Sequence, residues 1–475
     1  MTLTKSVVHA TRWSAFSKAS QLAVTIILAR LLSPDDVGIV TMASVFTGFV
    51  ILLSDLGTSA AIIQRANHPP GFLSSLFWIN IAVGVIAMAV VAVASPVVAL
   101  INDEPRLVPV LIVLSLSFPV TGLVALQRAL LEKVMRFETL ARIEMFSTAL
   151  GGIVGIAVAL AGGGIWALVF QTLAMLAATA AGVWKKSVWR PRFEVSLTEI
   201  RSIVGFSGYL TGFNIVNYFA RNADYMLIGS VLGKTELGYY SMAYRVLMFP
   251  LQNLSAVITR VTLPAFSKIQ ADDARFRRGY LASIGAIALI SFPVMAGIFS
   301  VARPFVDAAF GEQWLPIVPI LMIFAPVGLL QSIVATAGSI YIAKNQTALM
   351  FKWGLFAAVV VVTSFVVGLS WGPTGVAACY GAASLALAYP GMAIPLRLIG
   401  LKVKDSLGVL WAPFVSASLM ALLVVATSRA VSAVLAGWPL LIVDVAVGAV
   451  AYFVLNFLIN GDQLRMFRGF FTEQQ

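Results

Sequence analysis

Residues 206–250 read FSGYLTGFNIVNYFARNADYMLIGSVLGKTELGYYSMAYRVLMFP, and this stretch decides the fold. Its first half is apolar and long enough to cross a bilayer as a helix, which takes about 20 residues. Polar side chains recur at steps of 3, 4 and 3 and share one helical face: Asn214, Asn217, Arg221 and Asp224. A polar turn leads to a second apolar segment, which carries Arg245. Since charges at membrane depth cost about 2.5–3.5 kcal/mol each, the stretch predicts a functional site inside a membrane.

The composition extends this interpretation to the whole chain. Of 475 residues, 60% are hydrophobic and 11% are charged, whereas soluble proteins contain about 25% charged residues. Alternating segments of about 10 residues, typical of a membrane β-barrel, are absent. We predict an all-α integral membrane protein with about 14 transmembrane helices, at residues 12–32, 37–64, 71–101, 106–127, 143–162, 164–184, 202–232, 237–264, 279–302, 315–340, 349–370, 374–396, 407–428 and 437–460.

Lys and Arg residues are distributed unevenly over the connections between these segments. Of the 32, 25 fall on one predicted side and five on the other, and Arg221 and Arg245 lie within the membrane. Because basic connections stay in the cytoplasm, both termini are predicted to be cytoplasmic. The excess over 20 Asp and Glu therefore reflects topology, and no nucleic-acid partner is predicted. Contact of these connections with anionic lipid headgroups is a secondary expectation.

An internal repeat divides the chain. Residues 28–43 (LARLLSPDDVGIVTMA) align with residues 228–243 (IGSVLGKTELGYYSMA) at an offset of 200, with four identities. Six predicted helices separate the two windows, which indicates two parallel, pseudo-symmetric six-helix lobes with an appended helix pair. The predicted organisation is an N-lobe (1–184), a cytoplasmic linker (185–201), a C-lobe (202–400), and helices 13 and 14 with a cytoplasmic tail (401–475).

The same offset places Asn214, Asn217 and Arg221 on Ser14, Ser17 and Gln21, with Lys18 beside them. Two corresponding helices with polar stripes suggest a cavity between two lobes. The predicted substrate-binding residues are Ser14, Ser17, Lys18, Gln21, Asn214, Asn217, Arg221, Arg245 and Gln252, and the predicted ion-coupling residues are Asp55 and Asp224.

Several of these residues have a second interpretation. Arg221 and Asp224 can form a mutually neutralising pair that serves packing alone. Asp55 can instead mark a helix break before Gly57. Lys18 lies near the cytoplasmic boundary, where its side chain can reach the interface.

Residues that carry enzymatic chemistry are scarce. Cys379 is the only cysteine, and His9 and His68 are the only histidines. These numbers argue against a disulfide, a cysteine or histidine metal site and a histidine-based triad. No phosphate-binding Walker A motif occurs. We therefore expect no catalytic residue, no metal and no cofactor.

Two windows carry a family resemblance: residues 28–65 (LARLLSPDDVGIVTMASVFTGFVILLSDLGTSAAIIQR) and residues 217–273 (NYFARNADYMLIGSVLGKTELGYYSMAYRVLMFPLQNLSAVITRVTLPAFSKIQADD). They resemble bacterial Wzx-type polysaccharide and O-antigen flippases, the colanic-acid-exporter-like branch of the multidrug/oligosaccharidyl-lipid/polysaccharide flippase superfamily. The resemblance implies an inner-membrane protein that moves an undecaprenyl-diphosphate-linked oligosaccharide to the periplasmic leaflet by alternating access. It also implies that helices 1, 2, 7 and 8 line the cavity, and that a polysaccharide polymerase and export machinery are partners.

Two other functions stay open. The charges of Arg221 and Arg245 balance those of Asp55 and Asp224, and only Lys18 makes the predicted cavity positive. A neutral cavity also suits an ion-coupled multidrug antiporter of the same superfamily. A membrane-bound polysaccharide polymerase or ligase is the enzyme alternative, but the predicted outer connections are too short to hold a catalytic domain.

Overall fold

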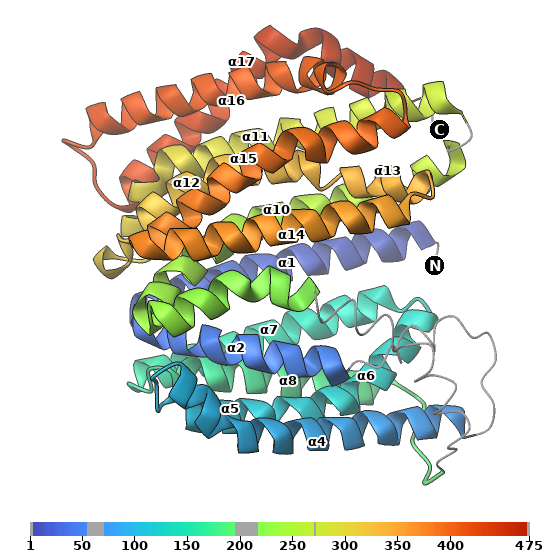
Figure 1. The fold of residues 1–475 in the computed structure, drawn as a ribbon, viewed down its shortest axis with the longest axis vertical. Coiled ribbons are helices and arrows are strands. Elements are labelled where there is room, and N and C mark those ends of the chain that lie inside the picture. The colour runs from blue at the N-terminus through green and yellow to red at the C-terminus, as the bar shows by residue number, and fades with distance from the viewer. Residues whose placement is uncertain (1–2, 55–70, 195–216, 270–271, 473–475) are drawn as a thin grey trace. The chain divides into compact units, whose positions relative to one another are not determined.

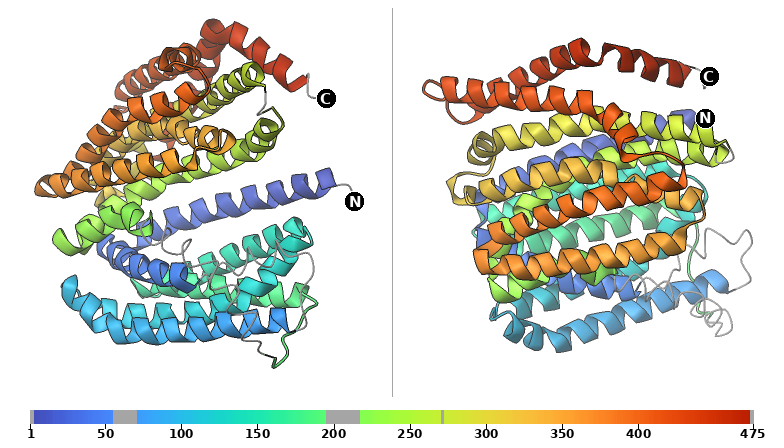
Figure 2. Two further views of the ribbon diagram at one scale, coloured as in Figure 1. Left: turned by 45° about the vertical axis from the view of Figure 1, so that its right-hand side comes forward. Right: turned by 45° about the horizontal axis from the view of Figure 1, so that its top comes forward.

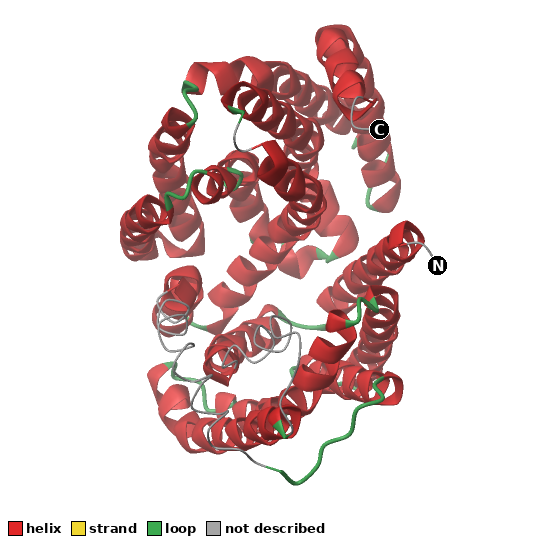
Figure 3. Cartoon of the chain, turned by 90° about the vertical axis from the view of Figure 1, so that its right-hand side faces the viewer, coloured by secondary structure: helices red, strands yellow, loops and turns green. Residues whose placement is uncertain are grey.

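The computed structural model of the chain describes residues 3–54, 71–194, 217–269 and 272–472, with side chains at 13–14, 16–50, 71–194, 217–251 and 272–459. Over these ranges the chain is helical and contains no strand (Figures 1 and 3). One helix covers residues 217–231. The others are α1 (Leu3–Leu31), α2 (Pro34–Ser54), α4 (Phe72–Ile101), α5 (Leu107–Ser115), α6 (Ser117–Lys133), α7 (Phe137–Leu160), α8 (Trp166–Lys186), α10 (Lys234–Ile269), α11 (Asp273–Ala309), α12 (Ile317–Val334), α13 (Ala337–Ala343), α14 (Thr347–Gly368), α15 (Gly372–Leu398), α16 (Val403–Val431) and α17 (Trp438–Thr472), with two short 3-10 helices, η1 (Glu312–Trp314) and η2 (Leu369–Trp371).

Each α-helix overlaps a predicted apolar segment, so the all-α class is confirmed. Within the described ranges, nine helical stretches are long and apolar enough to cross a membrane. One of them, Thr347–Leu398, holds both α14 and α15, which meet at η2 and pack against each other. The total of fourteen transmembrane helices and the cytoplasmic position of the termini remain predictions.

Equivalent helices of the sequence repeat have equivalent ends. α2 begins at Pro34 and α10 begins at Lys234, 200 residues later. The helices that precede them end at Leu31 and at residue 231, respectively. The offset found in the sequence therefore coincides with the helix boundaries.

A second pair of matching turns lies 210 residues apart. Met135, between α6 and α7, and Asn345, between α13 and α14, have positive φ angles of 55° and 52°. In both turns the next residue donates its backbone N–H to the carbonyl five residues earlier, at 2.9 Å from Arg136 to Leu131 and at 2.8 Å from Gln346 to Tyr341. This left-handed ending satisfies carbonyls left open at a helix C-terminus. The same ending follows α4, α7 and α15, so it marks the end of a helix and does not by itself extend the repeat.

The chain divides into two compact units, Met1–Gly238 and Tyr239–Gln475, and the division falls inside α10. The lobe, linker and tail boundaries from the sequence analysis remain predictions.

In the first unit, α1 packs on α7, α7 on α8, and α4 on α6. One core cluster joins Phe72 and Phe77 of α4 to Leu126 of α6. Residues 187–194, the first part of the predicted linker, follow α8 and bind to α4. The Trp78 indole donates to the Arg192 carbonyl at 2.9 Å, and the Arg192 N–H donates to Ser74 Oγ at 3.1 Å. This half of the predicted linker is therefore fixed to the unit.

In the second unit, α11 packs against α12, α16 and α17 (Figure 2). Its core cluster joins Phe276, Tyr280 and Ile284 of α11 to Leu396 of α15 and Leu410 of α16. The Tyr452 hydroxyl of α17 donates to the Leu289 carbonyl of α11 at 2.9 Å. The last two helices are thus attached to the unit by α11.

Candidate functional site

The polar stripe that opened the sequence analysis lies on the helix at residues 217–231. Asn217 and Arg221 are exposed, whereas Asp224 is only 5% exposed. The Asp224 carboxylate accepts the backbone N–H of Tyr225 at 2.8 Å. Within the described part of the chain, Arg221 and Asp224 form no ion pair with each other. The Asn217 amide and the Arg221 guanidinium are therefore accessible at the surface of the unit, whereas the Asp224 carboxylate is buried.

The equivalent residues of α1 also divide into exposed and buried side chains. Lys18 and Gln21 are exposed, and Ser14 is partly buried. Ser17 is 9% exposed, and its hydroxyl donates to Thr148 Oγ1 of α7 at 3.4 Å. Ser17 thus contacts a helix of its own unit.

The remaining predicted residues divide between the second unit and undescribed parts of the chain. Arg245 of α10 is exposed in the second unit. Asp55 and Asn214 lie outside the described residues, as does the side chain of Gln252.

Two aromatic residues beside Asn217 attach this helix to α2. The Tyr218 hydroxyl donates to the Val45 carbonyl at 2.6 Å. The rings of Phe219 and Phe49 lie 4.9 Å apart, centroid to centroid. The sequence analysis did not single out Tyr218 and Phe219, although their position next to a polar stripe was a usable signal. They hold the face that carries Arg221 in a fixed rotation against α2.

The first turns of α2 and α10 cross at very close range. A Cβ atom added to Gly38 would overlap the carbonyl oxygen of Lys234, and one added to Gly238 would overlap that of Pro34. Gly38 and Gly238 are repeat equivalents, and so are Pro34 and Lys234. The contact is therefore reciprocal, and only glycine fits at both positions. Small residues allow such close approach of helices in a membrane.

Polar contacts surround this crossing at the end of the unit that the sequence predicts to face outward. The Thr235 hydroxyl donates to Asp35 Oδ1 at 2.6 Å. Lys234 Nζ lies 2.5 Å from Glu104 Oε2, and Arg106 Nε lies 2.8 Å from Glu104 Oε1. The first turns of α2 and α10 and the connection after α4 are thus joined by charge-assisted hydrogen bonds.

Glu104 is the central carboxylate of this cluster. Burial of the carboxyl group raises its pKa. The hydrogen bonds from Arg106 and Lys234 together outweigh this effect and lower the pKa to about 2. Glu104 therefore stays ionised, and both cations stay bound to it, over the whole physiological pH range. Glu104 was not among the predicted site residues, because its partner Lys234 is 130 residues away and no sequence pattern relates the two.

This chain is similar to known proteins in both sequence and fold. A family model described as "Polysaccharide biosynthesis protein" matches residues 27–319. The teichuronic acid biosynthesis protein TuaB of Bacillus subtilis is 30% identical over 358 residues, which cover 74% of this chain and 74% of TuaB.

Two solved structures share the fold. The lipid II flippase MurJ in an inward closed conformation superposes with a TM-score of 0.73 at 15% identity, covering 96% of this chain and 100% of MurJ. An inward-facing multidrug resistance MATE family transporter of the MOP superfamily superposes with a TM-score of 0.63 at 17% identity, covering 81% of this chain and 94% of that one. Both identities are low, so these two likenesses concern the fold alone.

Proposed function

Since the chain belongs to the polysaccharide biosynthesis protein family, we propose that it is a flippase for lipid-linked oligosaccharides. It carries undecaprenyl-diphosphate-linked repeat units across the bacterial inner membrane for exopolysaccharide, capsule or O-antigen synthesis. The observation that supports this most directly is the family match over residues 27–319, well over half of the chain.

The physical requirement is a polar path for a headgroup that cannot cross hydrocarbon. The diphosphate and sugars need a cavity that opens to one side at a time, whereas the prenyl chain can remain in lipid. Arg221 is exposed on the helix at residues 217–231, and a guanidinium binds phosphate oxygens with two parallel hydrogen bonds. Asn217, Lys18 and Gln21, also exposed, suit sugar hydroxyls and phosphate. Arg221 is our proposed diphosphate ligand.

Helices α2 and α10, which we propose line the transport path, are joined at Gly38 and Gly238 on the predicted outer side. The reciprocal backbone contact and the Glu104 cluster leave the first turns of both helices tightly joined. Release of the substrate to the outer leaflet then requires these contacts to separate. An inside-negative potential favours outward movement of the diphosphate by about 2.3 kcal/mol per charge per 100 mV. Asp55 and Asp224 are the proposed residues for ion coupling.

The fold by itself also suits the alternative, an ion-coupled multidrug antiporter, because a MATE transporter shares it. The family match favours the flippase, since it names polysaccharide biosynthesis. The family description alone also fits a polymerase or ligase of the same process, and the fold favours the flippase because a lipid II flippase shares it. A polysaccharide polymerase and export machinery remain proposed partners of the flippase.

Deletion of the gene in its source organism tests the proposal against the antiporter. The flippase predicts loss of surface polysaccharide and accumulation of lipid-linked repeat units, both reversed by the plasmid-borne gene. Sensitivity to cationic dyes should stay at the wild-type level. A deletion strain that makes normal polysaccharide and becomes dye-sensitive would establish the antiporter instead.

A further inference from the structure

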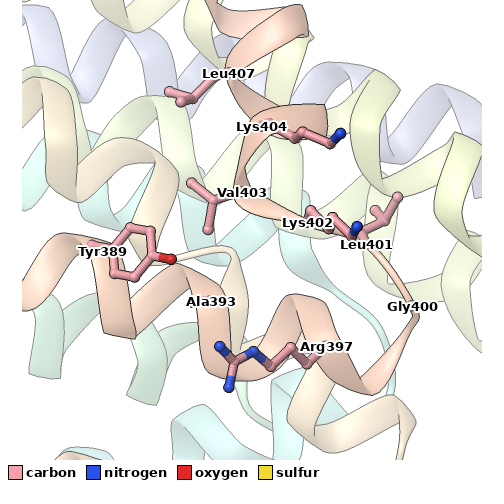
Figure 4. A pocket seen from close by; sticks show the side chains of 9 residues that line it. All are labelled: Tyr389, Ala393, Arg397, Gly400, Leu401, Lys402, Val403, Lys404 and Leu407. Carbon is pink, nitrogen blue, oxygen red and sulfur yellow. The ribbon is translucent and has the colours of Figure 1, made fainter.

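A cavity of about 680 Å³ lies in the second unit, between the end of α15 and the start of α16 (Figure 4). Its lining contains three cations, Arg397 from α15 and Lys402 and Lys404 from the start of α16. Figure 4 shows the Tyr389 side chain reaching into the space between the two helices. The connection between α15 and α16 is predicted to be cytoplasmic from its basic residues, so the cavity is predicted to lie at the level of the inner headgroups.

The three cations are not neutralised by the protein. Over the described residues, none of them forms an ion pair. The nearby carboxylate of Asp405 accepts the backbone N–H of Lys402 at 2.8 Å and so caps the first turn of α16. Asp405 keeps its negative charge in this hydrogen bond, so the three cations and Asp405 together carry a net charge of +2, which attracts an anion.

A fourth cation, Arg277, packs against the turn that contains Gly400. Gly400, which lines the cavity, has a φ angle of 69°, and a Cβ there would lie 2.6 Å from Arg277 Nη2 of α11. The Arg277 guanidinium thus packs directly on the Gly400 backbone. Its Nε is buried without a hydrogen-bond partner within the described structure. The nearest acid on α11, Asp273, is bound by Lys344 at 2.6 Å. The positive field at the turn therefore comes from two helices and the loop between α15 and α16.

Apolar side chains continue from the cavity along the helices. On α16, Leu407, Trp411 and Phe414 are exposed at steps of 4 and 3 and share one face. On α15, Leu385 and Tyr389 are exposed one turn apart. Leu407 and Tyr389 are themselves part of the cavity wall. A charged pocket that leads into apolar helix faces matches a molecule with an anionic headgroup and acyl chains.

We propose that this cavity binds the phosphate headgroup of an anionic phospholipid of the inner leaflet. Arg397, Lys402 and Lys404 contact the phosphate oxygens, and an acyl chain lies along Leu407 and Trp411. The cations favour a lipid with net negative charge, because the ammonium of a zwitterionic headgroup would be repelled. None of the residues that line the cavity is among those proposed for the transport path.

Native mass spectrometry of the purified full-length protein, titrated with phosphatidylglycerol in neutral detergent, measures this binding. The test variant is Arg397→Gln/Lys402→Gln/Lys404→Gln, and the matched control is Lys185→Gln/Lys186→Gln/Lys352→Gln, which removes three exposed lysines from the same predicted side. We expect the test variant to bind roughly 10- to 100-fold more weakly than wild type and the control to bind like wild type. Equal binding by all three proteins would overturn the proposal.

Two further arms make the outcome specific. The unfolding midpoint in neutral detergent reports whether the triple variant folds. If it does not fold, Lys404→Gln alone must weaken binding by about 5-fold, and unchanged binding would contradict the site.

Phosphatidylcholine of the same chain length and inorganic phosphate should not displace phosphatidylglycerol from the wild type. Displacement by inorganic phosphate alone would identify a free-anion site. Displacement by undecaprenyl diphosphate would assign the cavity to the transported lipid. Either result would refute the phospholipid assignment.

Discussion

Arg221 is an exposed guanidinium on a helix that Tyr218 and Phe219 hold against α2. If it binds the substrate diphosphate, Arg221→Ala should abolish polysaccharide export while the protein reaches the membrane in normal amounts. Arg221→Lys should restore part of the export, because it keeps the charge but loses the planar pair of donors. The measurement is surface polysaccharide per cell in a deletion strain that carries each variant.

The matched control for this prediction is Arg429→Ala, which removes an exposed arginine near the end of α16. It should export like wild type. Full export by Arg221→Ala would remove Arg221 from the proposed site.

The lowered pKa of Glu104 predicts how the stability of the protein depends on pH. This pKa falls from 4.5 to about 2 in the folded protein. A carboxylate with a lowered folded pKa contributes stability above its unfolded pKa, and this contribution is lost as the pH falls through the folded value. We expect Glu104→Gln to lower the unfolding midpoint by a constant amount above pH 5. The difference from wild type should shrink between pH 4.5 and about 2, as followed by thermal unfolding in detergent. A difference that does not change with pH would contradict the ion cluster.

The polar stripe was predictable because a spacing of 3 and 4 residues determines a helical face. This reasoning found Asn217 and Arg221, which are both exposed in the structure, although Phe219 between them is exposed as well. It could not tell that Asp224 turns inward or that Ser17 binds Thr148, because neighbouring helices decide which part of a stripe they cover.

At the scale of helices, the crossing of α2 and α10 depends on two glycines. Gly38→Ala places a methyl group on the Lys234 carbonyl oxygen, so the helices must separate or the backbone must shift, at a cost of about 1–3 kcal/mol. We expect a lower unfolding midpoint for Gly38→Ala and, by the repeat, for Gly238→Ala.

Gly354→Ala is the matched control for both glycine variants. Gly354 lies inside α14, and a Cβ there meets nothing within 4 Å. Alanine favours a helix over glycine by about 1 kcal/mol, so this variant should be as stable as wild type or more so. A Gly38→Ala protein as stable as the Gly354→Ala protein would show that the helices do not meet this closely in the membrane.

The sequence predicted that the turns before α2 and α10 correspond, but not that they touch. The offset of 200 relates Asp35 to Thr235 as equivalents, and in the structure these two side chains are hydrogen-bonded. Similarity between two segments does not reveal their contact, because the path of the intervening chain decides it. The same limit applies to Glu104 and Lys234.

At the scale of the whole molecule, the distribution of Lys and Arg predicts the orientation. A reporter that is active only in the cytoplasm should be active when fused after Gln475, and inactive when inserted at Gly163 in the turn between α7 and α8. Insertion at Val188, after α8, should restore activity. Equal activity at Gly163 and Val188 would contradict the predicted alternation and the fourteen spans that depend on it.

Composition and apolar segment length were sufficient for the all-α class, because a chain in lipid must satisfy its backbone hydrogen bonds in helices or in a closed barrel, and apolar segments of about 20 residues fit helices. The repeat was also visible, and the helix ends at Pro34 and Lys234 agree with it. The cavity between α15 and α16 was not predictable, since it depends on how Arg277 of α11 packs behind the Gly400 turn.

The central claim is that this chain moves lipid-linked oligosaccharides, and a reconstituted transport assay tests it most directly. Purified protein is placed in vesicles with the source organism's undecaprenyl-diphosphate-linked repeat unit, and a glycan-cleaving enzyme added outside measures how much substrate becomes accessible over time. We predict that wild type moves the substrate faster than empty vesicles and that Arg221→Ala does not. Wild-type protein that leaves the oligosaccharide in place but exchanges a cationic dye for an ion would contradict the account.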